Sequence, residues 1–225
     1  MIIKTFIEPP IDNNNYVLID EETKEGALID CSSPAIWNKV PYTRGRVSVS
    51  TVGENREEIE NVTLKYILLT HGHFDHIAGI KSKNSYLPDS TERPQIYMHK
   101  DDLNWVQEVN TFMPMMGMPE MDIPQIDVFV EDRDVIKLGN IEIRVIHTPG
   151  HTQGGVCYYT NGVLFSGDTI FREAVGRCDL QGGNFEQIVD SIENKLYKLP
   201  DDTIIYPGHG KQTTIGWEKE HNLFL

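Results

Sequence analysis

The chain has 225 residues, with 34 Asp and Glu against 20 Lys and Arg, which gives a formal net charge of -14. This length suits one domain with a substantial core, and so acidic a surface repels nucleic acid and anionic membranes, which we exclude as partners. No apolar run approaches the roughly 18 residues that span a bilayer, so we expect a single globular domain over residues 1–225.

In chain order, short runs rich in Ile, Val, Leu and Tyr and bounded by Gly, Asp, Asn or Pro predict strands. The predicted strands cover residues 2–7, 15–19, 26–30, 65–70, 95–98, 140–146, 156–160, 162–166 and 203–206. Helices are predicted near residues 55–61, 75–81, 100–110 and 184–198, and the last has apolar residues at helical three-and-four spacing. This mixture predicts an α/β fold in which helices cover the outer faces of sheets.

Two segments fit neither pattern. Residues 41–54 combine Pro and Gly with a short alternation of Val and Ser, which predicts an excursion or a small hairpin. Residues 111–124 contain five of the seven methionines together with three prolines. Proline excludes a regular helix here, so we expect either a loop that packs over its own core or a Met-rich flap that faces the substrate.

Three histidines and an aspartate lie together in residues 70–76, directly after the apolar run 66–69. The two-residue spacing of His71 and His73 points both imidazoles the same way on an extended loop. Asp75 and His76 follow where the chain is expected to turn into a helix, so that one segment is able to serve two neighbouring ions. Imidazole together with carboxylate suits Zn, Fe or Mn.

Three further candidate ligands, His151, Asp168 and His209, each follow an apolar run. With the first motif they complete a two-metal set, in which the two oxygens of Asp168 are able to bridge both ions. We expect the remaining histidines to be structural, and His147 has the alternative of orienting a ligand or its loop. The other two histidines are His99 and His221.

These motifs resemble the metallo-β-lactamase superfamily, whose signature is H-x-H-x-D-H followed by a distant His, Asp and His. The match covers nearly the whole chain and implies an αββα sandwich with two metals at one edge, between the sheets. Zinc is the metal we expect, with iron or manganese as alternatives. The resemblance implies His71, His73 and His151 on one ion, Asp75, His76 and His209 on the other, and Asp168 as the bridge.

Within that superfamily, segments 148–152, 167–171, 176–180, 206–210 and 213–220 resemble small bacterial proteins of the hydroxyacylglutathione hydrolase (glyoxalase II) group. This resemblance implies a dinuclear metallohydrolase that cleaves hydroxyacylglutathione or a related small acyl-thiol with a metal-bridging hydroxide. Asp75 and Asp168 are the candidate catalytic residues, Asp75 by orienting the hydroxide. Arg177 and Lys211 are candidates for binding an acidic group of the substrate, because arginine suits a carboxylate through its paired donors.

Other reactions remain open. Persulfide dioxygenases, with one iron held by two histidines and an aspartate, share the Gly-Arg-x-Asp segment at 176–179, although Gly208-His209-Gly210 follows the hydrolase pattern. Lactonase and β-lactamase-like hydrolysis are further alternatives on the same metal pair. The three cysteines form no C-x-x-C pair, which fits reduced thiols. Since the short N-terminal stretch does not have the pattern of a signal peptide, we expect a cytoplasmic protein.

Overall fold

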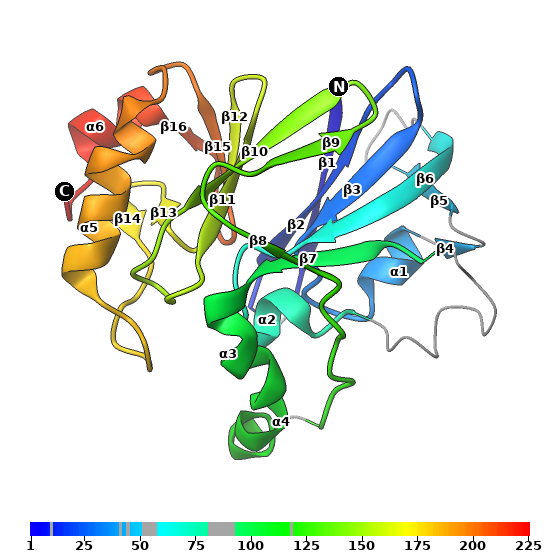
Figure 1. Ribbon diagram of the computed structural model, residues 1–225, viewed down its shortest axis with the longest axis horizontal. Helices are drawn as coiled ribbons and strands as arrows, with labels where there is room; N and C mark the ends of the chain where they lie inside the picture. Colours follow the sequence, from blue (N-terminus) through cyan, green and yellow to red (C-terminus); the bar gives the residue numbers. More distant parts are fainter. Residues whose placement is uncertain (10, 41, 44–45, 51–57, 81–92, 118) are drawn as a thin grey trace.

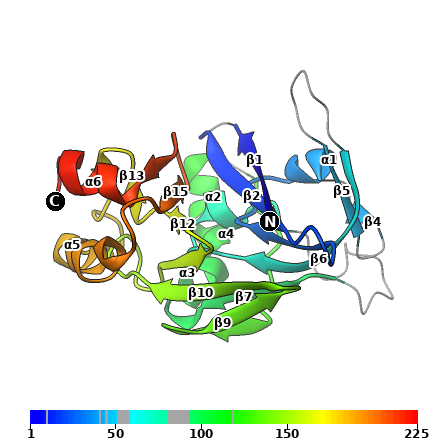
Figure 2. The same cartoon turned by 90° about the horizontal axis from the view of Figure 1, so that it is seen from above.

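The computed structural model describes residues 1–9, 11–40, 42–43, 46–50, 58–80, 93–117 and 119–225. Two large β-sheets pack face to face and helices lie on their outer sides (Figure 1). Seen from above, α5 and α6 lie at one side of the molecule and α1 lies at the other, with the sheets between them (Figure 2). In the described part of the chain, no helix has both the length and the apolar character that crossing a membrane requires.

The first sheet has eight strands in the order β1-β2-β3-β6-β5-β4, with β7 beside β6 and β8 beside β7. The pairs β3–β6, β6–β7 and β7–β8 are parallel. The strands are β1 (Ile2–Glu8), β2 (Asn13–Ile19), β3 (Glu25–Ile29), β4 (Tyr42–Thr43), β5 (Arg46–Ser50), β6 (Glu58–Leu68), β7 (Gln95–His99) and β8 (Val128–Val130).

The second sheet has six strands in the order β16-β15-β12-β11-β10-β9, and β12 is parallel to β15. A separate two-stranded ribbon, β13–β14, follows β12 along the chain. The strands are β9 (Val135–Leu138), β10 (Ile141–His147), β11 (Val156–Thr160), β12 (Val163–Gly167), β13 (Ile170–Phe171), β14 (Ala174–Val175), β15 (Ile204–Pro207) and β16 (Thr213–Thr214).

The helices are short except for α5. The α-helices are α1 (Ile36–Lys39), α2 (Phe74–Ile77), α3 (Leu103–Gln107), α4 (Val109–Phe112), α5 (Phe185–Asn194) and α6 (Ile215–His221), and the 3-10 helices are η1 (Lys100–Asp102), η2 (Pro114–Met116) and η3 (Leu196–Lys198). The side chain of Asn184 begins α5 by accepting a hydrogen bond from the Gln187 N–H at 3.0 Å, which satisfies a donor that the helix leaves free.

Three apolar cores separate the four layers. Because successive strand residues point to opposite faces, neighbours such as Leu164 and Phe165 enter different cores. Phe165 belongs to the core between the sheets, and Leu164 packs toward Ile188 and Ile192 of α5. The third core lies between the first sheet and the helices on its outer side, α1 to α4. The predicted αββα sandwich is confirmed.

Each predicted strand overlaps an observed strand, whereas the helix predicted over 55–61 is wrong from Glu58 onward. Residues 58–61 open β6, where buried Val62 and Leu64 continue a period of two that suits a strand; residues 55–57 lie outside the described residues. Within segment 41–54, Tyr42–Thr43 pairs with Arg46–Val47 in an antiparallel arrangement, as the small-hairpin alternative predicts. The C-terminal helix α6 was not predicted.

The Met-rich segment packs on its own core. Met113 is buried in the core beneath the first sheet, and Asn110 ties the segment back by accepting from Met121 N–H and donating to Met121 O, both at 2.9 Å. Among the described residues, none of those numbered 111–124 lines the pocket described below. The structure therefore favours the packing alternative over a flap.

Candidate functional site

The candidate ligands all lie at one edge of the sandwich, on segments that follow strands: Asp75 and His76 are in α2, and the others are in loops. The first four follow β6, His151 follows β10, Asp168 follows β12 and His209 follows β15. Backbone contacts hold these loops together: Val156 N–H donates to Thr70 O at 2.8 Å, and Asn14 N–H donates to Gly208 O at 2.7 Å. Loops from both sheets therefore meet at this edge.

Two glycines permit the close approach of these loops. A Cβ on Gly72 would lie 2.8 Å from Asp102 O and 3.0 Å from Trp105 Cβ. A Cβ on Gly208 would lie 2.2 Å from Asp168 Oδ1. Since Cβ atoms do not come so near to other heavy atoms, any larger residue at either position would push a candidate ligand out of place.

Three ring nitrogens converge on one point. His73 Nδ1 lies 3.1 Å from His71 Nε2 and 2.9 Å from His151 Nε2. All three imidazoles are buried, and burial lowers the pKa of His71 well below its ordinary value and that of His73 to about 3. The rings of His71 and His73 are therefore neutral near pH 7 and keep a lone pair available for a cation.

Hydrogen bonds on the outer side of the rings determine which nitrogen faces inward. His151 Nδ1 lies 2.7 Å from Arg177 O, a carbonyl that only accepts, so Nδ1 carries the proton and Nε2 presents its lone pair. His71 Nδ1 lies 3.1 Å from Thr70 Oγ1, and that hydroxyl donates its own hydrogen bond to Asp30 Oδ2 at 2.8 Å. His71 Nδ1 is therefore also the donor, and its Nε2 also faces the other rings as an acceptor.

A second group contains Asp75, His76 and His209. His209 Nε2 lies 3.3 Å from Asp75 Oδ2, and His76 Nε2 lies 3.8 Å from the same oxygen. The outward nitrogens again meet acceptors: His76 Nδ1 lies 2.8 Å from Asp30 Oδ2, and His209 Nδ1 lies 3.2 Å from Ile11 O. Their Nε2 atoms therefore point toward the carboxylate of Asp75.

Asp168 lies between the two groups. Its Oδ2 is 3.6 Å from both His151 Nε2 and His209 Nε2, and its Oδ1 is 3.4 Å from His76 Nε2. The Oδ1 atom is buried without a hydrogen-bond partner, which is costly for a carboxylate unless a cation lies against it. The donor set and this orphaned oxygen fit two metal ions that share Asp168.

The charges differ between the two groups. Burial raises the pKa of Asp75 and Asp168, but the surrounding histidines, His76 above all, outweigh burial and lower the pKa of both carboxyls. Burial lowers the pKa of His76, yet the carboxylates around it raise that pKa well above its ordinary value. The second group therefore combines opposed charges, whereas the rings of His71 and His73 in the first group are neutral.

Two buried carboxylates that the sequence reasoning missed support this arrangement. Asp30 contacts Thr70 N, Thr70 Oγ1 and His76 Nδ1, each at 2.8 Å. Asp102 accepts from Gly72 N at 2.9 Å, from Thr152 Oγ1 at 2.7 Å and from Gly154 N at 2.7 Å. An apolar strand ending in an aspartate, as 26–30 does, is the sequence signal that pointed toward Asp30.

The other predicted residues lie as follows. Arg177 lines the pocket, but its guanidinium pairs with Asp179, Nε to Oδ1 at 2.7 Å and Nη2 to Oδ2 at 2.8 Å. Lys211 is exposed and does not line the pocket.

His99 stacks on His147, with ring centroids 4.2 Å apart and an interplanar angle of 8°, and His221 stacks on Trp217. Parallel stacked rings cannot both direct a lone pair to one ion, which supports a structural role for His99.

A pocket of about 760 Å³ opens onto the candidate ligands. His73, Asp75, His151, Asp168 and His209 form its floor. Its size is in the range of about 300–1,000 Å³ that is typical of small-molecule sites. The ligands in the pocket lining are thus accessible to a small substrate through this pocket.

The comparisons with known proteins agree with this geometry. Residues 9–209 match the model of the metallo-beta-lactamase superfamily, and the chain belongs to this superfamily. The hydroxyacylglutathione hydrolase GloC of Haemophilus influenzae is 35% identical over 223 residues, covering 94% of this chain and 92% of that protein. The crystal structure of the B3 metallo-beta-lactamase BLEG-1 is 32% identical, with a TM-score of 0.78 and coverage of 100% and 99%.

A third similar protein, TTHA1623, was solved in a di-iron-bound form; it is 28% identical with a TM-score of 0.75, and the match covers 99% of this chain and 100% of that one. The probable metallo-hydrolase YqgX of Bacillus subtilis is 34% identical over 71% of this chain and 74% of that protein. The predicted family is confirmed, and the protein is a metallo-hydrolase of the metallo-β-lactamase superfamily.

Proposed function

We propose that the protein hydrolyses thioesters of small thiols with two divalent transition-metal ions, zinc for preference. The observation that carries the proposal is the inward direction of four histidine Nε2 atoms, each fixed by an outward contact of Nδ1 with an oxygen acceptor. Seven ligand side chains are more than one four-coordinate ion uses. His71, His73 and His151 would hold one ion, Asp75, His76 and His209 the other, and Asp168 both.

A bound divalent ion lowers the pKa of coordinated water to about 7 and polarises a carbonyl oxygen. Asp75 is ionised near neutral pH, because His76 and His209 lower its pKa, and it lies at the pocket floor. It is therefore suited to accept a hydrogen bond from the attacking water and to orient it toward the thioester carbonyl. The leaving thiolate, whose thiol pKa is about 8.5, departs without a strong general acid.

The relatives support this reaction class without deciding the substrate. GloC is a hydroxyacylglutathione hydrolase, so a similar chain is named for thioester cleavage. BLEG-1 is a B3 metallo-beta-lactamase, so lactam hydrolysis is the second candidate on this metal pair. Both reactions begin with attack of water on an acyl carbon, and the two differ in the group that leaves.

The experiment is a panel of substrates presented to protein loaded separately with zinc, iron or manganese. The panel contains S-lactoylglutathione, a neutral acyl thioester, a lactone, a β-lactam and glutathione persulfide with oxygen. We expect the highest kcat/KM for a thioester with two equivalents of metal bound. Oxygen consumption by protein that carries one iron, with no thioester turnover, would establish the dioxygenase alternative instead.

A further inference from the structure

The walls of the pocket are apolar above its ligand floor. Side chains from four separate segments face the same space: Ile11, Phe74, Trp105, Val109, Phe171 and Leu180. Ile11 is 44% exposed and Leu180 is 37% exposed. A single exposed apolar residue is ordinary, but several gathered around one pocket beside a reactive centre indicate a surface that a ligand covers.

The cation that the pocket offers is already paired. Arg177 is the one Lys or Arg among the described residues that line the pocket, and both oxygens of Asp179 occupy its guanidinium in a two-point contact. This hydrogen-bonded pair lowers the pKa of Asp179 to about 2, so the carboxylate is charged whenever a substrate arrives. An incoming carboxylate therefore meets a guanidinium whose paired donors already bind another carboxylate, two residues away in the sequence.

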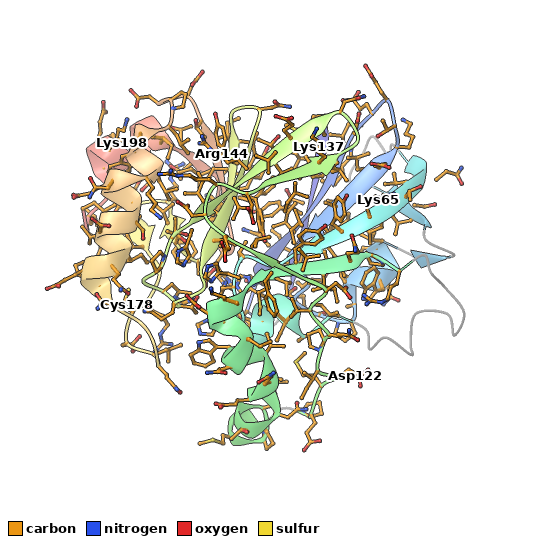
Figure 3. The ribbon with its side chains drawn as sticks, in the orientation of Figure 1. Lys65, Asp122, Lys137, Arg144, Cys178 and Lys198 are labelled. Carbon is orange, nitrogen blue, oxygen red and sulfur yellow. The ribbon has the colours of Figure 1, made fainter. Side chains whose placement is uncertain are left out.

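The location of this pair is fixed by the site itself. Arg177 O accepts from His151 Nδ1 at 2.7 Å, so the segment that contains Arg177 and Asp179 is held against a candidate ligand. Cys178, between these two residues, is labelled in the lower half of Figure 3, whereas Lys65, Lys137, Arg144 and Lys198 are labelled in the upper half.

We infer that the substrate is an acyl thioester whose acyl group is apolar and uncharged, and that Asp179 selects against carboxylate-bearing acyl groups by occupying Arg177. The inference rests on the proposed thioesterase function and extends it to a substrate class. Asp179 acts on specificity through Arg177, and Leu180 with its apolar neighbours contacts the acyl chain. We therefore expect Arg177 to bind a substrate carboxylate, as the sequence suggested, only in a variant that lacks the Asp179 carboxylate.

The test is kcat/KM for thioesters of one neutral thiol, N-acetylcysteamine, with acetyl, butyryl, pentanoyl, hexanoyl and succinyl groups. Pentanoyl and succinyl have similar sizes and differ in charge. For wild-type protein loaded with metal, we expect a rise of up to about four-fold per methylene from acetyl to hexanoyl and at least a ten-fold preference for pentanoyl over succinyl. A preference for succinyl, or no gain with chain length, would overturn the inference.

Two pairs of variants assign the effect to residues. Asp179→Asn should raise the succinyl-to-pentanoyl ratio ten-fold or more, and the double variant Asp179→Asn with Arg177→Gln should cancel that rise. Asp201→Asn is the matched control, because it removes another exposed carboxylate that pairs with a cation, Lys219, outside the pocket. An equal change of the ratio in Asp179→Asn and Asp201→Asn would overturn the role of Asp179.

Leu180→Asn should flatten the dependence on acyl length, and Leu223→Asn, at a residue that is 82% exposed and does not line the pocket, should keep it. The same flattening in both variants, or in neither, would contradict the assignment of the acyl pocket. Failure of the proposed function gives a different result, since fully metal-loaded protein would then turn over none of the five thioesters. Turnover with a reversed or flat preference would overturn the substrate class alone.

Discussion

The carboxylate of Asp102 accepts a hydrogen bond from Thr152 Oγ1 at 2.7 Å. Its other contacts, to Gly72 N and Gly154 N, make this one buried side chain a link between the loop of His71 and His73 and the loop of His151. Three ligands of one candidate ion thus depend on a residue that touches none of them. Partners of this kind orient ligands and tune their affinity for the metal.

Asp102→Asn should therefore weaken metal binding while the overall fold remains. An amide in place of the carboxylate sets an N–H₂ against N–H and O–H donors, and a lost partner of this kind costs about 10–100-fold in metal affinity and about 1–3 kcal/mol of stability. A competition titration with a coloured chelator measures the first, and thermal unfolding measures the second. Asp101→Asn, at a carboxylate that is 46% exposed next door, is the control; equal affinities in both variants would contradict the role of Asp102.

Asp168→Ala should lower the occupancy of both metal positions, because the lost carboxylate faces both groups of ligands. Activity should fall by more than the 10–100-fold or so that follows from losing a partner of a ligand. His99→Ala should keep the metal content of the wild-type protein, since His99 stacks on His147 away from the pocket lining. Elemental analysis of both variants measures the metal content. The same loss of metal in both would show that the assignment of Asp168 as a ligand and His99 as a structural residue is wrong.

The selectivity against succinyl thioesters should be constant between about pH 6 and 9. The Arg177 hydrogen bond lowers the pKa of Asp179 to about 2, so its carboxylate remains charged below the pH at which an ordinary aspartate takes up a proton, and the pairing disappears only as the pH falls toward 2. A substrate carboxyl with a pKa near the ordinary value of about 4 is also ionised throughout this range. Measuring the succinyl-to-pentanoyl ratio against pH decides it: a change centred near pH 6.5 would assign the selectivity to a histidine.

The three cysteines should differ in reactivity in the folded protein. Cys31 and Cys157 are fully buried and closed to reagents in solution, and burial raises the pKa of the Cys157 thiol to about 11, so Cys157 offers no thiolate near pH 8. Cys178 is partly exposed and should be modified first. A coloured disulfide reagent should titrate one thiol in native protein and three after unfolding; rapid reaction of all three in native protein would contradict the buried positions.

The sequence predicts the candidate ligands well because four of them are contiguous and each of the others ends an apolar run. It does not reveal the residues that hold them, since these contacts are made by the fold. Asp30 is 46 residues from His76, its partner, and Asp102 is 30 residues from Gly72. An aspartate at the end of an apolar strand, as Asp30 is, is equally typical of a turn residue or a solvated charge, so this signal alone does not identify the contact.

The secondary-structure elements likewise divide into those that the sequence predicts and those that depend on contacts made by the fold. Most strands of five or more residues were predicted, together with the four-residue β15. In contrast, β8 and β9, with three and four residues, were not predicted, and they owe their conformation to pairing with longer neighbours. The pairing of Arg177 with Asp179 was also not foreseen, because an arginine near a predicted site suggests a substrate contact as readily as an internal one. From this pairing we propose an apolar acyl group for the substrate, in place of the acidic group that Arg177 was expected to bind.

The most direct test of the central claim, a two-metal thioesterase, is a metal titration of chelator-treated protein with Zn²⁺. Hydrolysis of a neutral acyl thioester is measured after each addition, with metal content determined on the same samples. We predict that activity is complete at two equivalents of Zn²⁺. His209→Ala, which removes a ligand of the second group, should bind close to one equivalent and lose most of its activity. Full activity at one equivalent, or no thioester hydrolysis with two equivalents bound, would contradict it.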